Sequence, residues 1–220
     1  MSFSQIMSKY GQTSKGPIFV KPEQKKNNAF QYASSLIKSD IDKVDSDMIQ
    51  VTNEILKNGC IYLPNFICET NNYDYFDKIK KELEPETNVI QWSKHYKFEN
   101  PEFSKTFNEI IEKIKNHFNV EVLCTRLNYY KNGNDYKPLH HDSHAFSNNK
   151  KENFTVGISF GASREITFMH VKSKKKFNFP QNNGDLFAFN DIINKEFMHG
   201  IPKANINVKE RISIIAWCKK

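Results

Sequence analysis

The chain has no long hydrophobic run. Nowhere in its 220 residues does an apolar stretch approach the roughly 20 residues that a membrane-spanning helix needs. Residues 1–10 lack both the charged start and the apolar centre of a secretory signal. We therefore expect an intracellular protein, in the cytoplasm or nucleus, with no membrane partner.

Cysteine is sparse and scattered. The four cysteines, Cys60, Cys68, Cys124 and Cys218, lie in separate apolar stretches. A disulfide framework or a zinc site would show itself as cysteines at characteristic spacings, which this chain lacks. We therefore predict buried free thiols in a reducing compartment.

Apolar residues are plentiful enough for one core. They make up 38% of the chain, with 18 phenylalanines among them, and the length fits a single domain. Residues 1–44 have few periodic apolar positions and many Lys, Gln, Asn and Ser. We expect them to form a polar, partly flexible extension with one strand at residues 17–20. Residues 45–220 should form the folded domain, which we expect to be a monomer.

Positive charge is in excess, with a formal net charge of +7 and an isoelectric point near 9.1. Lysine contacts with phosphate release counterions, so this charge permits binding to nucleic acid. It does not require such binding, because Lys and Asn are common throughout the chain. The basic run Lys172-Ser173-Lys174-Lys175-Lys176 lies between two predicted strands and fits a solvated hairpin loop; the sharper alternative is a phosphate contact.

Helical periodicity marks the first part of the domain. We expect three helices, over residues 48–56, 76–83 and 103–118. Asn58-Gly59 should end the first helix and Pro85 the second, while Asn100-Pro101 predicts the N-cap and first residue of the third. The third helix should pack against the core through Phe103, Phe107, Ile110, Ile111, Ile114 and Phe118.

Strands dominate the rest of the chain. Besides a short strand at 60–63, β-rich runs cover residues 120–130, 154–160, 165–171, 185–189, 197–201 and 211–217. Turn signals such as Asn132-Gly133 and Asn182-Asn183-Gly184 separate them. Helices followed by many short antiparallel strands predict an α+β fold. Its β part should be a jelly roll of the cupin kind, that is, a double-stranded β-helix, flanked by the N-terminal helices.

The segment His140-His141-Asp142 suggests a metal site. Side chains alternate along a strand, so His140 and Asp142 should share one face while His141 points away. Together with His199 they supply two imidazoles and one carboxylate. That set forms the facial triad of non-haem Fe(II), which leaves positions open for a cosubstrate and O2. His144 stands at the same spacing from Asp142 and is the alternative ligand.

The segment Arg211-Ile212-Ser213 adds a fixed cation near the end of the chain. A guanidinium is planar and always charged, and it meets a carboxylate through two parallel hydrogen bonds. Arg211 could therefore hold a dicarboxylate.

These motifs together resemble those of the AlkB-like branch of the Fe(II)/2-oxoglutarate dioxygenases. The resemblance covers about residues 58–218 and rests on Leu127–Gly133, His140–Asp142, Ile158–Gly161, Gly184–Leu186, His199–Pro202 and Arg211–Ser213. It implies a double-stranded β-helix that uses Fe(II), 2-oxoglutarate and O2. Members of that branch oxidise an alkyl group, often an N-methyl group on a nucleic-acid base, which then leaves as an aldehyde.

The resemblance also assigns roles to individual residues. It implies iron ligation by His140, Asp142 and His199, and so prefers His140 to His144. It implies that Arg211 pairs with the far carboxylate of 2-oxoglutarate. Further cosubstrate or lining positions are Asn128, Tyr130, Ser159 and Ser213.

Substrate contacts are expected at the mouth of the site. Between the second and third helices, Trp92, His95 and Tyr96 could stack on a flipped base or could equally cap the core. His144 stands where the family has an acidic base-recognising residue. Arg164 lies at the mouth in this family, although a surface arginine is equally plausible.

Two departures bear on the substrate. Trp217 occupies the position of a second family arginine, and the segment available for a nucleotide-recognising lid, residues 86–100, is short. We therefore expect an oxidative demethylase of alkylated bases in single-stranded DNA or RNA. The alternatives are a hydroxylase of a protein or small molecule on the same scaffold, and a non-catalytic nucleic-acid-binding module.

Overall fold

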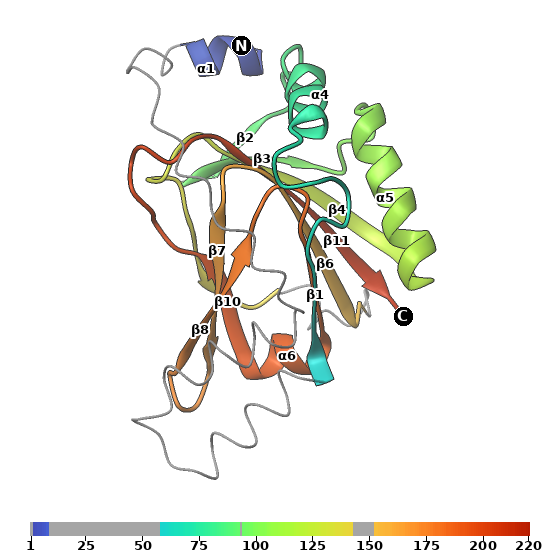
Figure 1. The fold of residues 1–220 in the computed structure, drawn as a ribbon, viewed down its shortest axis with the longest axis vertical. Coiled ribbons are helices and arrows are strands. Elements are labelled where there is room, and N and C mark those ends of the chain that lie inside the picture. The colour runs from blue at the N-terminus through green and yellow to red at the C-terminus, as the bar shows by residue number, and fades with distance from the viewer. Residues whose placement is uncertain (1, 9–57, 93, 143–151) are drawn as a thin grey trace.

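The computed structural model describes residues 2–8, 58–92, 94–142 and 152–220 (Figure 1). The helix expected at 48–56 and the strand expected at 17–20 lie outside these residues, as does His144. None of the described helices is both long and apolar enough to cross a membrane.

Two antiparallel sheets form the body of the molecule. The major sheet has seven strands in the order β1 (Cys60–Leu63), β9 (Leu186–Asn190), β6 (Phe154–Gly161), β11 (Arg211–Lys219), β4 (Glu121–Tyr130), β3 (His95–Glu99) and β2 (Ile90–Trp92). The minor sheet has four strands in the order β5 (Lys137–His140), β10 (Phe197–Ile201), β7 (Arg164–His170) and β8 (Lys176–Gln181). This arrangement confirms the predicted α+β fold with a jelly-roll core.

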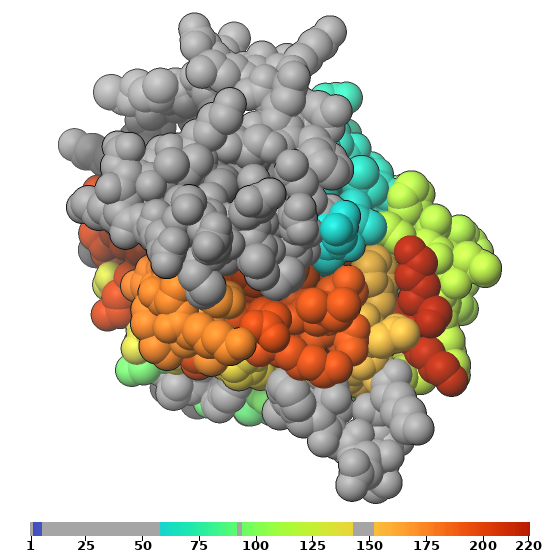
Figure 2. Space-filling model, turned by 90° about the horizontal axis from the view of Figure 1, so that it is seen from below, coloured from blue at the N-terminus to red at the C-terminus, as the bar shows by residue number. Residues whose placement is uncertain are grey.

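Helices α4 (Asp74–Leu83) and α5 (Lys105–Phe118) cover the outer face of the major sheet, and the minor sheet lies on its other side (Figure 1). Two short helices complete the fold, α1 (Phe3–Ser8) and α6 (Asp191–Glu196). From below, the orange segments, which include the β7–β8 hairpin and α6, form a band across the molecule, and the C-terminal residues lie beside α5 (Figure 2).

The helices and the outer face of the major sheet enclose the larger core. Side chains from α4 and α5, such as Ile79 and Ile110, are fully buried against alternate strand residues, such as Leu127 and Ile214. Each strand residue of this core is followed by one that points to the other face, because side chains alternate along a strand. Strands β4 and β11 therefore carry one apolar face and one face toward the minor sheet.

The smaller core lies between the two sheets and is almost entirely aromatic. It consists of Phe168, Phe177, Phe179, Phe187, Phe189, Ile193 and Phe197. Phe168 lies at its centre, with its ring centroid 5.3 Å from that of Phe187 and 5.5 Å from that of Phe189. This cluster holds the sheets together at one end, beside the cavity described below.

The start of the chain also contributes to the core. The Phe3 side chain is 1% exposed and packs edge-on against the rings of Tyr96, Phe98 and Tyr129. Its backbone N–H donates to the carbonyl of Glu86. Phe3 belongs to the segment that we predicted to be a polar extension. Its burial was not foreseen, because a single aromatic residue gives no periodic signal.

Most predicted elements are observed. The strands expected within the described residues are confirmed to within one or two residues, and Lys172–Lys176 does lie at a hairpin, between β7 and β8. The β2–β3 hairpin, β8 and the short helices α1 and α6 were not expected. Each of these elements is short, so its pairing and packing partners, rather than a long periodic pattern of its own, determine its structure.

The predicted start of the third helix was wrong. Helix α5 begins after Ser104, whose side chain accepts from the Phe107 N–H at 3.0 Å. Asn100 instead has a positive φ of 43°, and its side chain accepts from the Thr125 N–H at 2.8 Å. Ser104 thus caps the free N–H groups at the start of the helix. This is the role predicted for Asn100, which lies four residues earlier.

All four cysteines are free thiols, as predicted. Cys218 is fully buried, whereas Cys60, Cys68 and Cys124 are each partly exposed. The expectation that all four would be buried is therefore corrected, because Cys68 in particular lies in a loop before α4 rather than in a strand.

Candidate functional site

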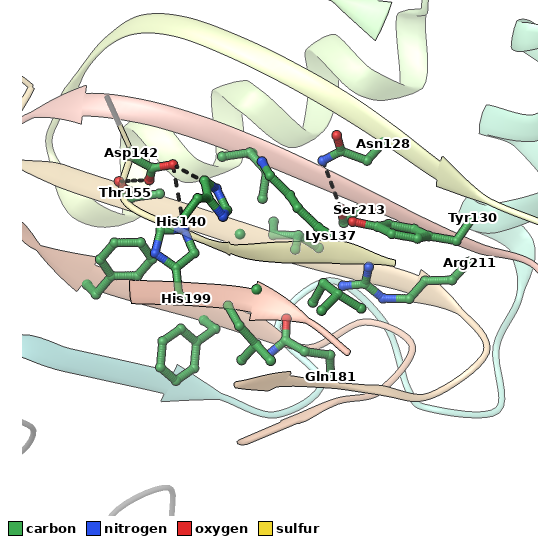
Figure 3. A pocket seen from close by; sticks show the side chains of 18 of the residues that line it. Asn128, Tyr130, Lys137, His140, Asp142, Thr155, Gln181, His199, Arg211 and Ser213 are labelled. Atoms are coloured by element: carbon green, nitrogen blue, oxygen red, sulfur yellow. Dashed lines mark hydrogen bonds and ion pairs between the residues drawn. The ribbon is translucent and has the colours of Figure 1, made fainter. Parts of the chain in front are cut away.

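A cavity opens between the inner face of the major sheet and the minor sheet (Figure 3). It is lined from β4, β6, β9 and β11 on one side and from β5, β7, β8 and β10 on the other. Imidazole and carboxylate groups gather at one end and a guanidinium lies at the other (Figure 3).

Two histidines and one aspartate converge at the first end. His140, the last residue of β5, is paired directly with His199 of β10. The Nε2 atoms of His140 and His199 lie 3.6 and 3.5 Å from the Asp142 Oδ1. Ligand atoms of all three residues lie within 4.8 Å of one another, so the group could hold a metal ion.

The position of Asp142 does not come from strand alternation, which corrects the expectation. Strand β5 ends at His140, and Asp142 lies beyond it. Asn194 of α6 fixes it instead: the Asp142 N–H donates to Asn194 Oδ1 at 2.8 Å, and Asn194 Nδ2 donates to the Asp142 carbonyl at 3.1 Å. Sequence reasoning missed Asn194, because an asparagine in a short polar helix carries no local signal.

Neighbouring groups prepare the triad for a cation. His140 Nδ1–H donates to the Pro138 carbonyl at 3.0 Å, which leaves the Nε2 lone pair directed at the centre of the group. Burial lowers the pKa of His140, so the neutral imidazole that a metal needs is favoured.

Asp142 is 5% exposed, and Thr155 Oγ1 donates to its Oδ2 at 3.2 Å. Burial alone would raise the pKa of this carboxyl group. The neighbouring imidazoles of His199 and His140 outweigh that effect and hold the pKa well below its usual range. The group at this end is therefore a carboxylate facing two imidazoles.

Arg211 occupies the other end of the cavity and is 1% exposed. Its Nε–H donates to Ser159 Oγ at 2.9 Å, and its guanidinium carbon lies 5.1 Å from the centre of the Tyr130 ring. Burial lowers the pKa of Arg211 to about 10. Within the described residues its Nη1 is buried without a hydrogen-bond partner. A buried cation with an open N–H group fits one carboxylate of a ligand.

The expected cosubstrate residues lie together around Arg211. Asn128, Tyr130 and Ser213 line the cavity, and Asn128 Nδ2 donates to Ser213 Oγ at 3.2 Å (Figure 3). Strand pairing explains this, because Arg211 is paired with Tyr130 and Ser213 with both Asn128 and Ser159. Residues opposed across an antiparallel pair share one face.

His95 and Tyr96 are both buried inside the protein. His95 is 3% exposed and stacks on Tyr130, with 4.9 Å between ring centroids, while its ring nitrogens face Tyr136 O and Asn128 Oδ1. Tyr96 is 2% exposed and packs in the outer core against Phe3. Of the two alternatives, stacking on a base and capping the core, the burial of these rings favours the second: His95 packs against the expected cosubstrate residues and Tyr96 packs in the core.

Arg164 is a structural clamp rather than a substrate contact. It is 4% exposed and donates from its Nη atoms to the carbonyl oxygens of Asn132, Asp135 and Pro202. Those oxygens lie on two separate loops, so the guanidinium ties the loops together. Trp92 belongs to β2, but its side chain, like His144, lies outside what the structure describes.

Among the polar residues that line the cavity, Lys137, Thr155 and Gln181 were not expected. Each lies on a strand that forms a wall of the cavity, and none belongs to a motif with a characteristic spacing. Trp217, at the position where the AlkB-like resemblance implies a second arginine, is 2% exposed and lines the cavity on the same face as Arg211.

Comparisons with known proteins agree with this geometry. The profile of the 2OG-Fe(II) oxygenase superfamily matches residues 52–215. A solved 2OG-Fe(II) oxygenase family oxidoreductase from Burkholderia pseudomallei superposes with a TM-score of 0.53 at 14% identity, covering 80% of this chain and 91% of that one. The structure of OsALKBH1 gives a TM-score of 0.50 at 14% identity, covering 72% and 97%. At such identities these likenesses show the fold.

One curated relative also matches, the uncharacterized protein R406 of Acanthamoeba polyphaga mimivirus, at 27% identity over 99 residues. The match covers 45% of this chain and half the length of that relative. Because the superfamily profile covers most of the chain and the fold agrees, this protein belongs to the 2OG-Fe(II) oxygenase superfamily, whose members are oxidoreductases that use Fe(II), 2-oxoglutarate and O2.

Proposed function

We propose that His140, Asp142 and His199 hold the Fe(II). The observation that carries this assignment is their convergence within 4.8 Å at one end of the cavity. Two imidazoles and one carboxylate form the donor set of the facial triad, which leaves three positions open. When bound, the iron and 2-oxoglutarate supply the oxidising chemistry, and the protein supplies orientation.

The cosubstrate lies along the cavity in this proposal. Arg211 binds the carboxylate far from the metal, and its open Nη1 provides the donor. Ser159 and Tyr130 hold the guanidinium in place, and Asn128 and Ser213 line the path to the triad. The aromatic cluster around Phe168 closes the cavity behind His199, which excludes water from that side.

For the substrate, we propose an alkylated base in single-stranded DNA or RNA, as in the AlkB-like branch. Three features support this: the fold similarity to OsALKBH1, the excess positive charge, and the motif resemblance described above. The chain's family membership makes it an enzyme, which argues against a non-catalytic binding module.

The test is incubation with Fe(II), 2-oxoglutarate and ascorbate, followed by mass spectrometry of methylated single-stranded DNA and RNA. We expect loss of methyl groups and formation of succinate with the wild type, and neither with Asp142→Ala. If Asp142→Ala keeps its Fe(II)-dependent turnover, the triad assignment is wrong.

One observation favours a second candidate, a hydroxylase of a protein or small molecule. Strands β2 and β3 form a hairpin, which extends the major sheet, and His95 and Tyr96 are buried in it. That segment therefore offers few side chains to hold a flipped base. Succinate formation without any loss of methyl from oligonucleotides would favour this candidate.

A further inference from the structure

Gln181 interrupts the apolar inner face of β8. Side chains alternate along a strand, and the buried residues of β8 are Phe177, Phe179 and Gln181. The two phenylalanines belong to the aromatic cluster between the sheets, whereas Gln181 places an amide on the same face. A buried amide costs free energy unless its hydrogen-bonding groups are paired, so we expect a polar partner at this position.

Strand pairing places Gln181 at the end of the cavity away from the triad. Phe168 of β7 is paired with His199 on one side and with Phe177 on the other, so Phe177 lies level with His199. Gln181 is four residues further along β8, which is about 13 Å at the usual rise per residue. Gln181 therefore lines the same cavity as the triad but lies far from it (Figure 3).

One hydroxyl group links Gln181 to Arg211. Ser159 Oγ accepts from Arg211 Nε–H at 2.9 Å and donates to the Gln181 carbonyl at 3.4 Å. The guanidinium and the backbone of Gln181 are therefore both held by the same oxygen atom. Because both side chains also line the cavity, the Gln181 amide and Arg211 Nη1 lie at the same end of it.

The Gln181 amide keeps hydrogen-bonding capacity for a ligand. Its nitrogen carries two hydrogens, and Nε2 donates one of them to the Pro180 carbonyl at 2.8 Å. A carbonyl oxygen can only accept, so this contact also identifies the nitrogen end of the amide. Among the described residues this is the one hydrogen bond of the side chain, which leaves a second N–H group for a ligand.

This pair of donors suits a carboxylate. Arg211 supplies one positive charge, which balances the single negative charge of a carboxylate. A neutral amide N–H can donate to the second carboxylate oxygen without adding a charge that would have to be buried. Arg211 and Gln181 together therefore match a carboxylate both in charge and in donor groups.

We propose that Gln181 recognises the far carboxylate of 2-oxoglutarate together with Arg211. Its second Nε2–H donates to one carboxylate oxygen, and Arg211 Nη1 donates to the other. This inference rests on the proposed role of Arg211 and adds a residue that selects 2-oxo acids with a second carboxylate. The two residues come from different sheets, Gln181 from the minor and Arg211 from the major one, so no motif spacing relates them.

The experiment measures the binding of two 2-oxo acids, by calorimetry, to protein loaded with redox-inert Mn(II). One is 2-oxoglutarate, and the other is 2-oxopentanoate, which has a methyl group in place of the far carboxylate. Gln181→Met keeps the length of the side chain but removes the amide. We expect it to weaken 2-oxoglutarate binding by roughly 10-fold, the loss expected for a hydrogen bond to a charged group, and to leave 2-oxopentanoate binding unchanged.

Two further variants serve as controls. Gln91→Met makes the same replacement at an exposed position of the edge strand β2 and should leave both affinities unchanged. Gln181→Glu keeps the shape of the side chain but places a carboxylate beside that of the ligand, so it should weaken 2-oxoglutarate binding more than Gln181→Met does. Urea denaturation of each variant shows whether the protein used for calorimetry is folded.

Each outcome bears on one assignment. If Gln181→Met binds 2-oxoglutarate as tightly as the wild type, or loses affinity equally for both acids, the inference is wrong while the proposed function stands. If Gln181→Met does not fold, Gln181→Glu decides, because an affinity for 2-oxoglutarate equal to that of the wild type would overturn the inference. If the wild type binds 2-oxopentanoate as tightly as 2-oxoglutarate, the far carboxylate is not recognised, and the proposed role of Arg211 is wrong as well.

Discussion

The two faces of β11 have different roles: one packs in the core and the other lines the cavity. Ile212, Ile214 and Ala216 point outward and are fully buried against the helices. Arg211, Ser213 and Trp217 point inward and line the cavity. The outer residues contribute stability through apolar burial, whereas the inner ones hold polar and charged groups that cost free energy to bury. A period of two along one strand thus separates folding from chemistry.

The largest loss of stability is expected from a substitution on the outer face of β11. Ile214→Ala should lower the free energy of unfolding by about 2–5 kcal/mol, because it leaves a cavity in a packed core. Urea denaturation measures that loss. Calorimetry well below the transition should show unchanged 2-oxoglutarate affinity; a marked loss in still-folded protein would mean that the two faces are coupled.

Acid should lower the stability of the protein through His95, on the inner face of the major sheet. Burial, reinforced by the charge of Lys137, lowers its pKa from 6.5 to about 4 in the folded protein. The unfolded chain therefore binds a proton more readily. The full stability is present above pH 6.5 and falls as the pH drops from 6.5 toward 4, by an amount on the order of 3 kcal/mol.

The measurement is the free energy of unfolding at pH 7 and at pH 4.5, for the wild type and for His95→Gln. The variant lacks a titrating group at this position, so its stability should change less between the two pH values. An identical pH dependence in both proteins would contradict the burial argument.

Replacing Arg211 tests the opposite property of the inner face. Arg211→Met should weaken 2-oxoglutarate binding by roughly 10-fold or more, since a charge-assisted pair contributes about 1.5–3 kcal/mol. The unfolding free energy should not fall, because the buried guanidinium opposes folding until a ligand reaches it. Calorimetry of the Mn(II)-loaded protein measures the affinity. An unchanged affinity would exclude this anchor.

The smallest effect is expected beside the triad. Thr155→Val removes the hydroxyl that donates to Asp142 Oδ2 but keeps the side-chain volume. Loss of such a supporting hydrogen bond should weaken metal binding by about 10-fold. Competition with a fluorescent chelator measures it, and Thr125→Val, on another strand and without a contact to Asp142, is the matched control. Equal losses in both variants would point to general destabilisation.

The chemistry was easier to predict than its surroundings. His140, Asp142, His199 and Arg211 belong to spaced motifs, and the structure brings the first three together and places the fourth in the same cavity. Arg164 was misjudged, because its three carbonyl partners lie on loops that only the folded chain brings near.

The same distinction applies to the helices and strands: long elements with a periodic pattern could be predicted, and elements that depend on distant partners could not. Helix α5 and the long strands β4, β6 and β11 have enough periodic residues to reveal themselves. The β2–β3 hairpin does not, since its structure depends on pairing with β4. This pairing also explains why His95 supports Asn128 instead of facing a substrate.

The kind of chemistry and the fold class could be predicted from the chain alone, because ligand identity, motif order and apolar periodicity are local properties. How Asp142 is held and which way Lys137 points could not be predicted, because both depend on the folded arrangement. Asn194 fixes the first and a β-bulge against β10 fixes the second. Both depend on contacts between segments about 50 or more residues apart, which no local pattern encodes.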